Sequence, residues 1–148
     1  MDRRTPPLYD SHESRGAQFT DFGGWEMPVE FASIRAEHAA VRESVGKFDV
    51  SHMGRIAVSG PDAGPLSNRL TTNDVSELGP GEAQYTAITD EDGVMLDDAV
   101  VYRLPVDAQA GYLVVPNAGH DGETHDRWVT GSERRGFDAT VENWTESY

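Results

Sequence analysis

Two neighbouring aspartates, Asp97 and Asp98, lie in the middle of the apolar stretch GVMLDDAVVY at residues 93–102. The stretch is typical of a β-strand, where aspartate is rare because its side chain competes for backbone hydrogen bonds and because a buried charge is costly. Successive strand side chains point to opposite faces, so the two carboxylates cannot share a face. Asp98 falls between Leu96 and Val100 on an apolar face, where a carboxylate needs a partner or a ligand.

Asp97 shares the opposite face with Arg103, and we expect it to be solvated at an edge. The pattern leaves two interpretations of Asp98 open. It could accept backbone amides from a loop and stabilise the fold, or it could bind a donor-rich heterocycle in an aromatic-lined pocket. Tyr85 and Tyr102 could stack against such a ring and Met53 could pack against it, although each could equally be a core residue.

The elements that must position these residues begin with a β-hairpin. AQYTAIT at 83–89 and VMLDDAVVYRL at 94–104 have the composition of strands, and DEDG at 90–93 that of a turn. GYLVVP at 111–116 is a further strand, which Pro116 closes because proline lacks the amide for a continuing ladder. The remaining expected strands are one long or two short strands at 48–60 and one strand at 137–143.

Helices are expected between these strands. Apolar residues recur at helical spacing from 31 to 45, and Gly46 could supply the left-handed residue that commonly ends a helix. Further helices are expected at 61–70 and 118–133. Residues 1–30 are rich in proline, glycine and charge, and we expect irregular structure there, anchored by Trp25, Met27 and Phe31. Mixed helices and hairpin strands favour an α+β domain with a largely antiparallel sheet and two or three helices.

The charge of the chain restricts its partners. There are 26 acidic and 12 basic residues, a formal net charge of −14, and Lys47 is the single lysine. This balance argues against a nucleic-acid partner, because the phosphate backbone is bound by clustered basic side chains. An acidic, lysine-poor surface fits a protein that works in concentrated salt, where screening removes self-repulsion. We therefore hypothesise a salt-adapted cytoplasm.

Several kinds of site are disfavoured. The chain has no cysteine, which removes disulfides and thiolate chemistry. Its five histidines show no helical pair backed by a glutamate, so no metal site is expected. No apolar run approaches the roughly 20 residues of a membrane span, and the N-terminus lacks the apolar core of a signal peptide. We expect no membrane partner and a cytoplasmic location.

A series of motifs resembles a known family. The motifs, in chain order, are TPPLYDSH, DFGGWEMPVEF, EHAAVRESVGKFDVSHMG, SGPDA, TNDVSEL, AQYTAIT, GVMLDDAVVYR and LVVPNAG. Together they resemble the amino-terminal part of the aminomethyltransferases, the T-proteins of the glycine cleavage system. The resemblance runs from Thr5 to about Gly119, and it implies the N-terminal folate-binding part of a T-protein-like fold.

The resemblance implies an activity and its partners. A T-protein takes the aminomethyl group carried on the dihydrolipoyl arm of the lipoylated H-protein, releases ammonia and passes the one-carbon unit to tetrahydrofolate. Tetrahydrofolate is then a co-substrate, and no metal is implied. The essential acidic residue of the family is the second aspartate of its D-D-x-x-V-Y element, which falls on Asp98. Family matching also places Met53, Tyr85, Val100, Tyr102 and Asn117 against the folate.

Length separates this chain from the family pattern. Family members are longer, with several domains around a folate channel, so we expect residues 1–148 to be an N-terminal part without the remaining domains. Whether this part is active alone is left open by the sequence. Three alternatives are open: a non-catalytic folate-binding relative of the iron–sulfur cluster maintenance type, one half of a split enzyme, or a partly folded remnant. FDVSHMG and DDAVVYR favour the T-protein.

Overall fold

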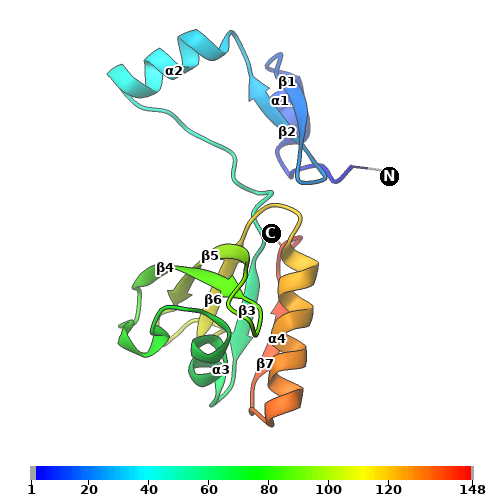
Figure 1. Cartoon of the computed structure of the whole chain (residues 1–148). Helices are drawn as coiled ribbons and strands as arrows, with labels where there is room; N and C mark the ends of the chain where they lie inside the picture. Colours follow the sequence, from blue (N-terminus) through cyan, green and yellow to red (C-terminus); the bar gives the residue numbers. More distant parts are fainter. Residues whose placement is uncertain (1–2, 148) are drawn as a thin grey trace. The chain divides into compact units, whose positions relative to one another are not determined.

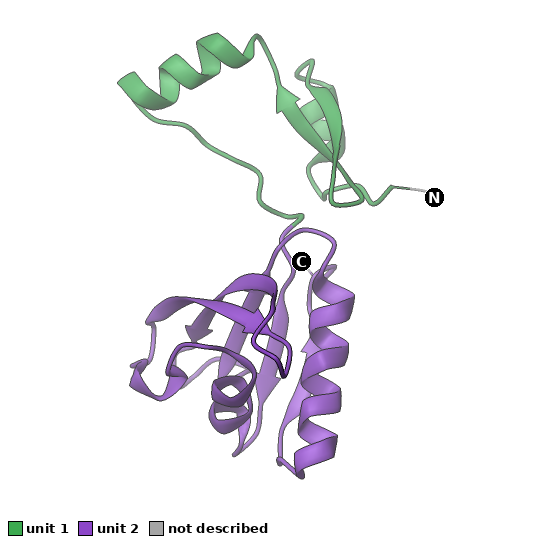
Figure 2. Cartoon of the chain, in the orientation of Figure 1, with its two compact units in different colours: residues 1–52 green, residues 53–148 purple. Residues whose placement is uncertain are grey.

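The structure, a computed structural model, describes residues 3–147 of the 148-residue chain (Figure 1). The chain divides into two compact units, residues 1–52 and residues 53–148 (Figure 2). The described residues form four α-helices, one more than the largest expected number, because a short helix is present near the N-terminus. The α+β class and the antiparallel pairing agree with the prediction.

The first unit contains a hairpin and two helices. Its elements are α1 (Tyr9–Glu13), β1 (Gln18–Phe22), β2 (Trp25–Glu30) and α2 (Ile34–Glu43), with β1 and β2 antiparallel. The expectation of irregular structure over residues 1–30 is therefore wrong, because the Gly-rich segment between the strands is a tight turn. Trp25 and Met27 are buried as predicted, whereas Phe31 is 42% exposed and does not serve as an anchor.

Helix α2 begins with a side-chain cap and ends before its expected glycine. The Ser33 hydroxyl accepts the amide of Ala36, and the Glu37 carboxylate accepts the amides of residues 31 and 32. These backbone hydrogen bonds lower the pKa of Glu37. The helix is followed by Ser44 with φ −145°, and Gly46 does not have a positive φ. The prediction of a left-handed cap at Gly46 is wrong.

The second unit is a five-stranded sheet covered by helices. Its elements are β3 (Ile56–Ser59), α3 (Ala63–Leu70), a 3-10 turn η1 (Val75–Glu77), β4 (Ala83–Thr89), β5 (Met95–Arg103), β6 (Tyr112–Pro116), α4 (Asp121–Arg135) and β7 (Thr140–Asn143). The strand order is β4-β5-β6-β3-β7, and every neighbouring pair is antiparallel. The 83–89 and 94–104 strands were predicted almost to the residue, because their alternation and turn are local signals.

The core of this unit lies between the sheet and helices α3 and α4. Ile56, Val58, Val101 and Val114 from the strands are fully buried, together with Trp128 of α4. The Trp128 ring nitrogen lies 3.4 Å from the Ser67 hydroxyl of α3, which joins the two helices. One face of the sheet is thus covered, and the side chains on the opposite face are left for other contacts.

Two further strand predictions need correction. Residues 48–53 do not form a strand, and only Ile56–Ser59 of the expected 48–60 stretch joins the sheet. Here Asp49 accepts the Ser51 amide, a turn contact that competes with an extended ladder. The last strand begins at Thr140 rather than 137, because Gly136, with φ +69°, and Phe137 close the end of α4.

Candidate functional site

The sheet face that carries Asp98 is the exposed one. Ala99 and Val101, on the other face of β5, are 2% and 0% exposed. On the same face as Asp98, by contrast, Leu96 and Tyr102 are 51% and 40% exposed. The pattern predicted correctly that Asp98 shares an apolar face, but that face is not the one packed into the core of this unit. A carboxylate therefore lies within an accessible apolar surface.

Asp98 is held by side chains from both neighbouring strands. The Tyr85 hydroxyl of β4 donates to Asp98 Oδ2 at 2.6 Å, and the Asn117 side-chain amide, just after β6, donates to Asp98 Oδ1 at 2.9 Å. The register explains the first contact, since Asp98 is opposite Ala87 and Tyr85 is therefore its diagonal neighbour. The side chain is fixed between one donor from β4 and one donor that directly follows β6.

Tyr85 remains a hydrogen-bond donor over a wide pH range. The hydrogen bond to Asp98 raises the pKa of the Tyr85 hydroxyl, and desolvation and the nearby carboxylate charges raise it further. Its ring is 64% exposed beside this bond. Tyr85 thus combines an exposed aromatic surface with an anchored hydroxyl, which suits stacking against a planar ligand.

The expectation that Asp97 is a solvated edge residue is wrong. Its side chain is only 10% exposed, because it points to the helix-covered face of the sheet. Asn117 donates to Asp97 Oδ1 at 2.8 Å, and His120 Nδ1 lies 2.9 Å from Asp97 Oδ2. Burial raises the pKa of Asp97, but the hydrogen bonds from Asn117 and His120 outweigh it, so the pKa is lowered overall.

Asn117 connects the two aspartates. Ala99 pairs with Pro116, so the residue after β6 continues alongside Asp98. The Asn117 amide nitrogen reaches carboxylate oxygens of both Asp97 and Asp98. His120 belongs to the same turn, since its amide donates to the Asn117 carbonyl at 3.2 Å. The sequence prediction did not select His120. The only feature that could have indicated its role is its position shortly after Asn117 in the chain.

The other predicted residues lie around this cluster. Val100 is partly buried, and it pairs with Tyr85 on one side and Val115 on the other. Tyr102 lies on the same face of β5 as Asp98 and Val100, two residues beyond Val100. Met53 is partly buried and is followed by Gly54, whose amide donates to the Pro116 carbonyl at 3.3 Å, so Met53 lies at the Asn117 end of the sheet.

The cluster has the chemistry of a binding site for a donor-bearing ligand. An ionised carboxylate offers about four acceptor positions, and Tyr85 and Asn117 occupy one on each oxygen of Asp98. Remaining lone pairs can accept N–H groups of a ligand lying on the aromatic face. Within residues 3–147, no group of three or more His, Cys, Asp or Glu side chains could hold a metal ion. No helix of the described part is long and apolar enough to cross a membrane.

An α+β domain with an ordered carboxylate on an aromatic sheet face defines a candidate small-molecule-binding protein. Comparison with known families makes the assignment specific, because the profile of the GCVT N-terminal domain matches residues 8–148. The chain belongs to the GCVT N-terminal domain family.

Individual relatives agree with this family. The chain is 66% identical over all 148 residues to a protein of Haloarcula marismortui named "Probable aminomethyltransferase", and 44% identical over 146 residues to the aminomethyltransferase of Lysinibacillus sphaericus. The crystal structure of glycine cleavage system aminomethyltransferase T from Bartonella henselae matches 95% of this chain with a TM-score of 0.81 at 31% identity. The resemblance inferred from the motifs is confirmed.

The matches also bear on length and on salt. This chain spans 41% of the length of the Haloarcula relative and 38% of the length of the Bartonella chain. A relative from Halobacterium salinarum is 62% identical. These matches to proteins of halophilic organisms fit the salt adaptation inferred from the acidic, lysine-poor composition.

Proposed function

We propose that this chain supplies the acidic residue and one wall of the tetrahydrofolate site of a glycine cleavage aminomethyltransferase. The observation that carries the proposal is the Asp98 carboxylate, held between Tyr85 and Asn117 on an exposed apolar face. Family membership supports the reaction class, and the motif resemblance implies that the essential acidic residue of the family falls on Asp98. The chain would act in the cytoplasm.

The proposed reaction moves one carbon between two carriers. In the aminomethyl-dihydrolipoyl arm of the H-protein, the methylene is bonded to sulfur and to nitrogen. Both bonds break, ammonia leaves, and the sulfur regains its proton as a thiol. The methylene forms bonds to N5 and N10 of tetrahydrofolate, which together lose two hydrogens, and 5,10-methylenetetrahydrofolate results. Lipoylated H-protein and tetrahydrofolate are therefore the proposed partners, and no metal takes part in the scheme.

Asp98 would act as a fixed negative charge in this reaction. Its free lone pairs would accept hydrogen bonds from the N5 and N10 edge of the folate and stabilise positive charge that develops at the transferred methylene. A preorganised charge in a site that excludes water can lower a barrier by several kcal/mol. Because Tyr85 and Asn117 already fix the carboxylate, little reorganisation is needed when the folate binds.

The neighbouring side chains would hold the ring system. The rings of Tyr85 and Tyr102 are exposed on the Asp98 face and would contact the planar part of the folate. Val100 is paired with Tyr85 and lies two residues before Tyr102 on the same face. Met53 would pack at the Asn117 end of the sheet. Asn117 would act chiefly by orienting Asp98, since its amide nitrogen already bonds both aspartates.

Titration with tetrahydrofolate tests the proposal. We expect saturable binding to the chain in molar KCl under anaerobic conditions, measured by calorimetry. Asp98→Asn keeps the shape but removes the charge, and we expect it to weaken binding about tenfold or more, because hydrogen bonds to a charged group contribute about 1.5–3 kcal/mol.

A matched control is Asp107→Asn, which removes one charge from an exposed loop residue and should leave binding unchanged. Absence of saturable binding to the unsubstituted chain, or equal binding by Asp98→Asn, would contradict the proposal. Aminomethyl transfer is measured separately, with H-protein as donor. Folate binding without transfer would also be expected of an N-terminal part that lacks the remaining domains, so the titration and not the transfer assay decides the proposal.

A further inference from the structure

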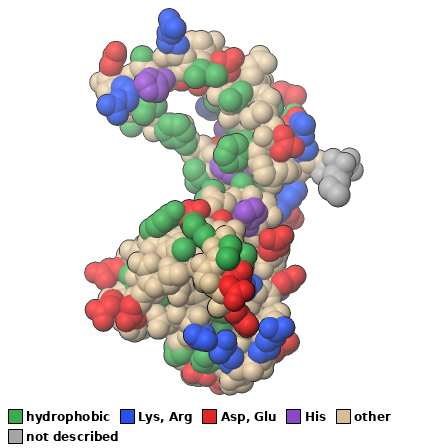
Figure 3. Space-filling model, viewed as in Figure 1, with side chains coloured by type: hydrophobic (Ala, Val, Ile, Leu, Met, Phe, Trp, Pro, Cys, Tyr) green, Lys and Arg blue, Asp and Glu red, His purple; other side chains and the backbone are tan. Residues whose placement is uncertain are grey.

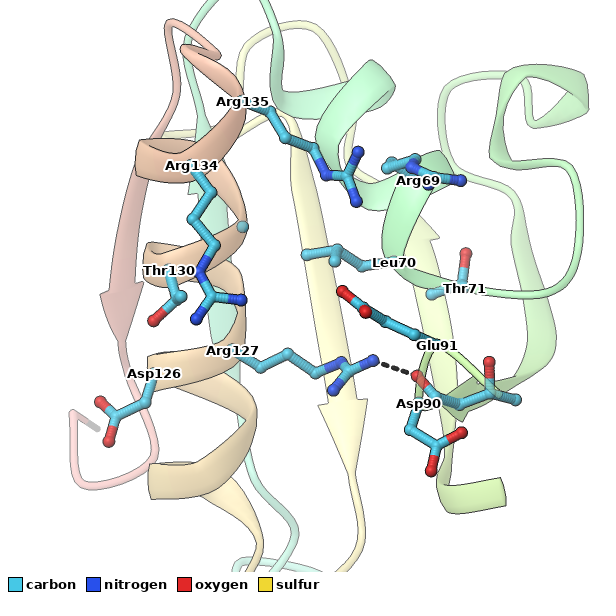
Figure 4. A pocket seen from close by; sticks show the side chains of 12 residues that line it. Arg69, Leu70, Thr71, Asp90, Glu91, Asp126, Arg127, Thr130, Arg134 and Arg135 are labelled. Carbon is cyan, nitrogen blue, oxygen red and sulfur yellow. Dashed lines mark hydrogen bonds between the residues drawn. The ribbon is translucent and has the colours of Figure 1, made fainter. Parts of the chain in front are cut away.

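A concave site distinct from the Asp98 cluster lies on the helix-covered side of the second unit. It is a groove of about 1040 Å³ between the C-terminal halves of α3 and α4 and the β4–β5 turn. Four of the twelve basic residues of the chain line it: Arg69, Arg127, Arg134 and Arg135 (Figure 4). In the view of Figure 3, Lys and Arg side chains cluster in one area of the surface of this unit. This concentration stands out in a chain of charge −14.

Three of these arginines have no acidic partner. Among residues 3–147, no carboxylate lies within ion-pair distance of Arg69, Arg134 or Arg135, although the chain has 26 acidic residues. All three are exposed. Their guanidinium groups are therefore free to bind a ligand without first breaking an ion pair.

The fourth arginine is anchored within the groove. Arg127 Nη2 donates to the Thr89 carbonyl at the end of β4, so its side chain spans from α4 to the hairpin (Figure 4). Its Nε is buried and has no hydrogen-bond partner among the described residues. Arg127 thus contributes a positive charge whose position is fixed by the backbone.

The acidic residues at the groove do not cancel this charge. Asp126 is 84% exposed, lies 3.2 Å from His125, and points away from the arginines (Figure 4). The Asp90 carboxylate accepts the amides of Asp92 and Val94 and so stabilises the turn. Glu91, exposed at the turn, is the one lining carboxylate without such a role and would compete with an anionic ligand.

Helix-end electrostatics explain only part of the arrangement. Arg69 lies in the last turn of α3, and Arg134 and Arg135 lie in the last turn of α4, where a cation interacts favourably with the helix dipole. That effect accounts for each position separately. It accounts neither for the convergence of two helix ends on one groove nor for Arg127, which is further back in α4.

We propose that this groove binds a flexible molecule that carries two or more oxyanion groups, either carboxylates or phosphates. Guanidinium groups match both kinds of oxyanion with paired hydrogen bonds. The groove is too large for a single small anion, and its arginines come from two helices, so a multivalent ligand would use them together. None of its lining residues is aromatic, which disfavours a nucleobase. The hydroxyls of Thr71 and Thr130 provide further donors.

Calorimetric titration with two probes tests this inference. Tripolyphosphate and tetraglutamate represent the two chemistries, and we expect at least one to bind with a stoichiometry near one per chain. The double variant Arg134→Gln with Arg135→Gln should weaken that binding about tenfold or more. Glu91→Gln should strengthen it, because a competing charge is removed. The preferred probe identifies the source of the oxyanion.

Arg42→Gln is the control for charge alone, since Arg42 also lies in the last turn of a helix but in the first unit. Its binding should equal that of the unsubstituted chain. Circular dichroism verifies that each variant is folded, and Arg69→Gln provides a second, independent loss if the double variant unfolds. The inference is overturned if neither probe binds, or if Arg42→Gln weakens binding as much as the groove variants.

Discussion

At the scale of single residues, Asn117 is the most informative side chain in the candidate site. One amide nitrogen carries two hydrogens, and here both are directed at carboxylates, one on each face of β5. The position of Asp98 on the open face is thereby coupled to that of Asp97 on the covered face. A substitution at Asn117 would therefore affect both stability and ligand binding.

Asn117→Ala should lower the free energy of unfolding by about 1–3 kcal/mol, because Asp97 is nearly buried and would lose a donor. It should also weaken tetrahydrofolate binding, because Asp98 would become free to rotate. Urea unfolding and calorimetry measure the two effects. Asn73→Ala, at an exposed position, is the control. Loss of stability with undiminished folate binding would argue against the orienting role.

Asp97 gives a pH dependence of defined sign. Its pKa is lowered below the ordinary value of 3.8, so the unfolded chain binds this proton more tightly than the folded chain. The stabilising contribution is complete above that value and is lost as the pH falls through the lower pKa of the folded state. Urea unfolding between pH 6 and 3 should show a steeper loss of stability for the unsubstituted chain than for Asp97→Asn. Parallel curves would contradict this assignment.

At the scale of elements, the sequence predicted local structure such as the β4–β5 hairpin correctly, but it did not predict which surfaces pack together in the folded unit. The hairpin of β4 and β5 was predicted because alternation and turn composition are encoded within a few residues. Which face of β5 is buried was not evident, since both faces carry apolar residues and the choice depends on where α3 and α4 pack. The contact between Asp97 and His120 was not evident for the same reason, since it also depends on how the helices pack against the sheet. Helix α1 and strands β1 and β2 were missed because each is only five or six residues long and the segments that flank them contain most of the proline and glycine of residues 1–30.

Two glycines of the second unit should respond in opposite directions to alanine. Gly60, just after β3, has φ +101°, and a Cβ there would lie 2.7 Å from the Asp138 carbonyl oxygen. Gly60→Ala should destabilise the fold by about 1–3 kcal/mol. Gly122, in α4, has open space around it, so Gly122→Ala should be neutral or stabilising by up to about 1 kcal/mol. Thermal unfolding compares them, and equal effects would contradict the described backbone.

At the scale of the whole molecule, the charge of −14 should make stability depend on salt. The Debye length falls from about 10 Å at 0.1 M to about 3 Å at 1 M, which removes most repulsion between exposed carboxylates. We expect the urea midpoint of unfolding to rise between 0.1 M and 2 M KCl. Equal midpoints would rule out salt adaptation. Composition alone supports this prediction, whereas the arrangement of the arginine groove required the folded structure.

The shortage of lysine has a practical consequence for the two units. Lys47 is the only lysine, and it lies in the exposed stretch without helix or strand between α2 and β3. A lysine-specific protease therefore has one side-chain target, located close to the boundary at residue 52. Cleavage there yields a peptide with the N-terminal hairpin and a larger product with the five-stranded sheet, Asp98 and the arginine groove. The natural sequence thus provides a route to study the second unit apart from the first.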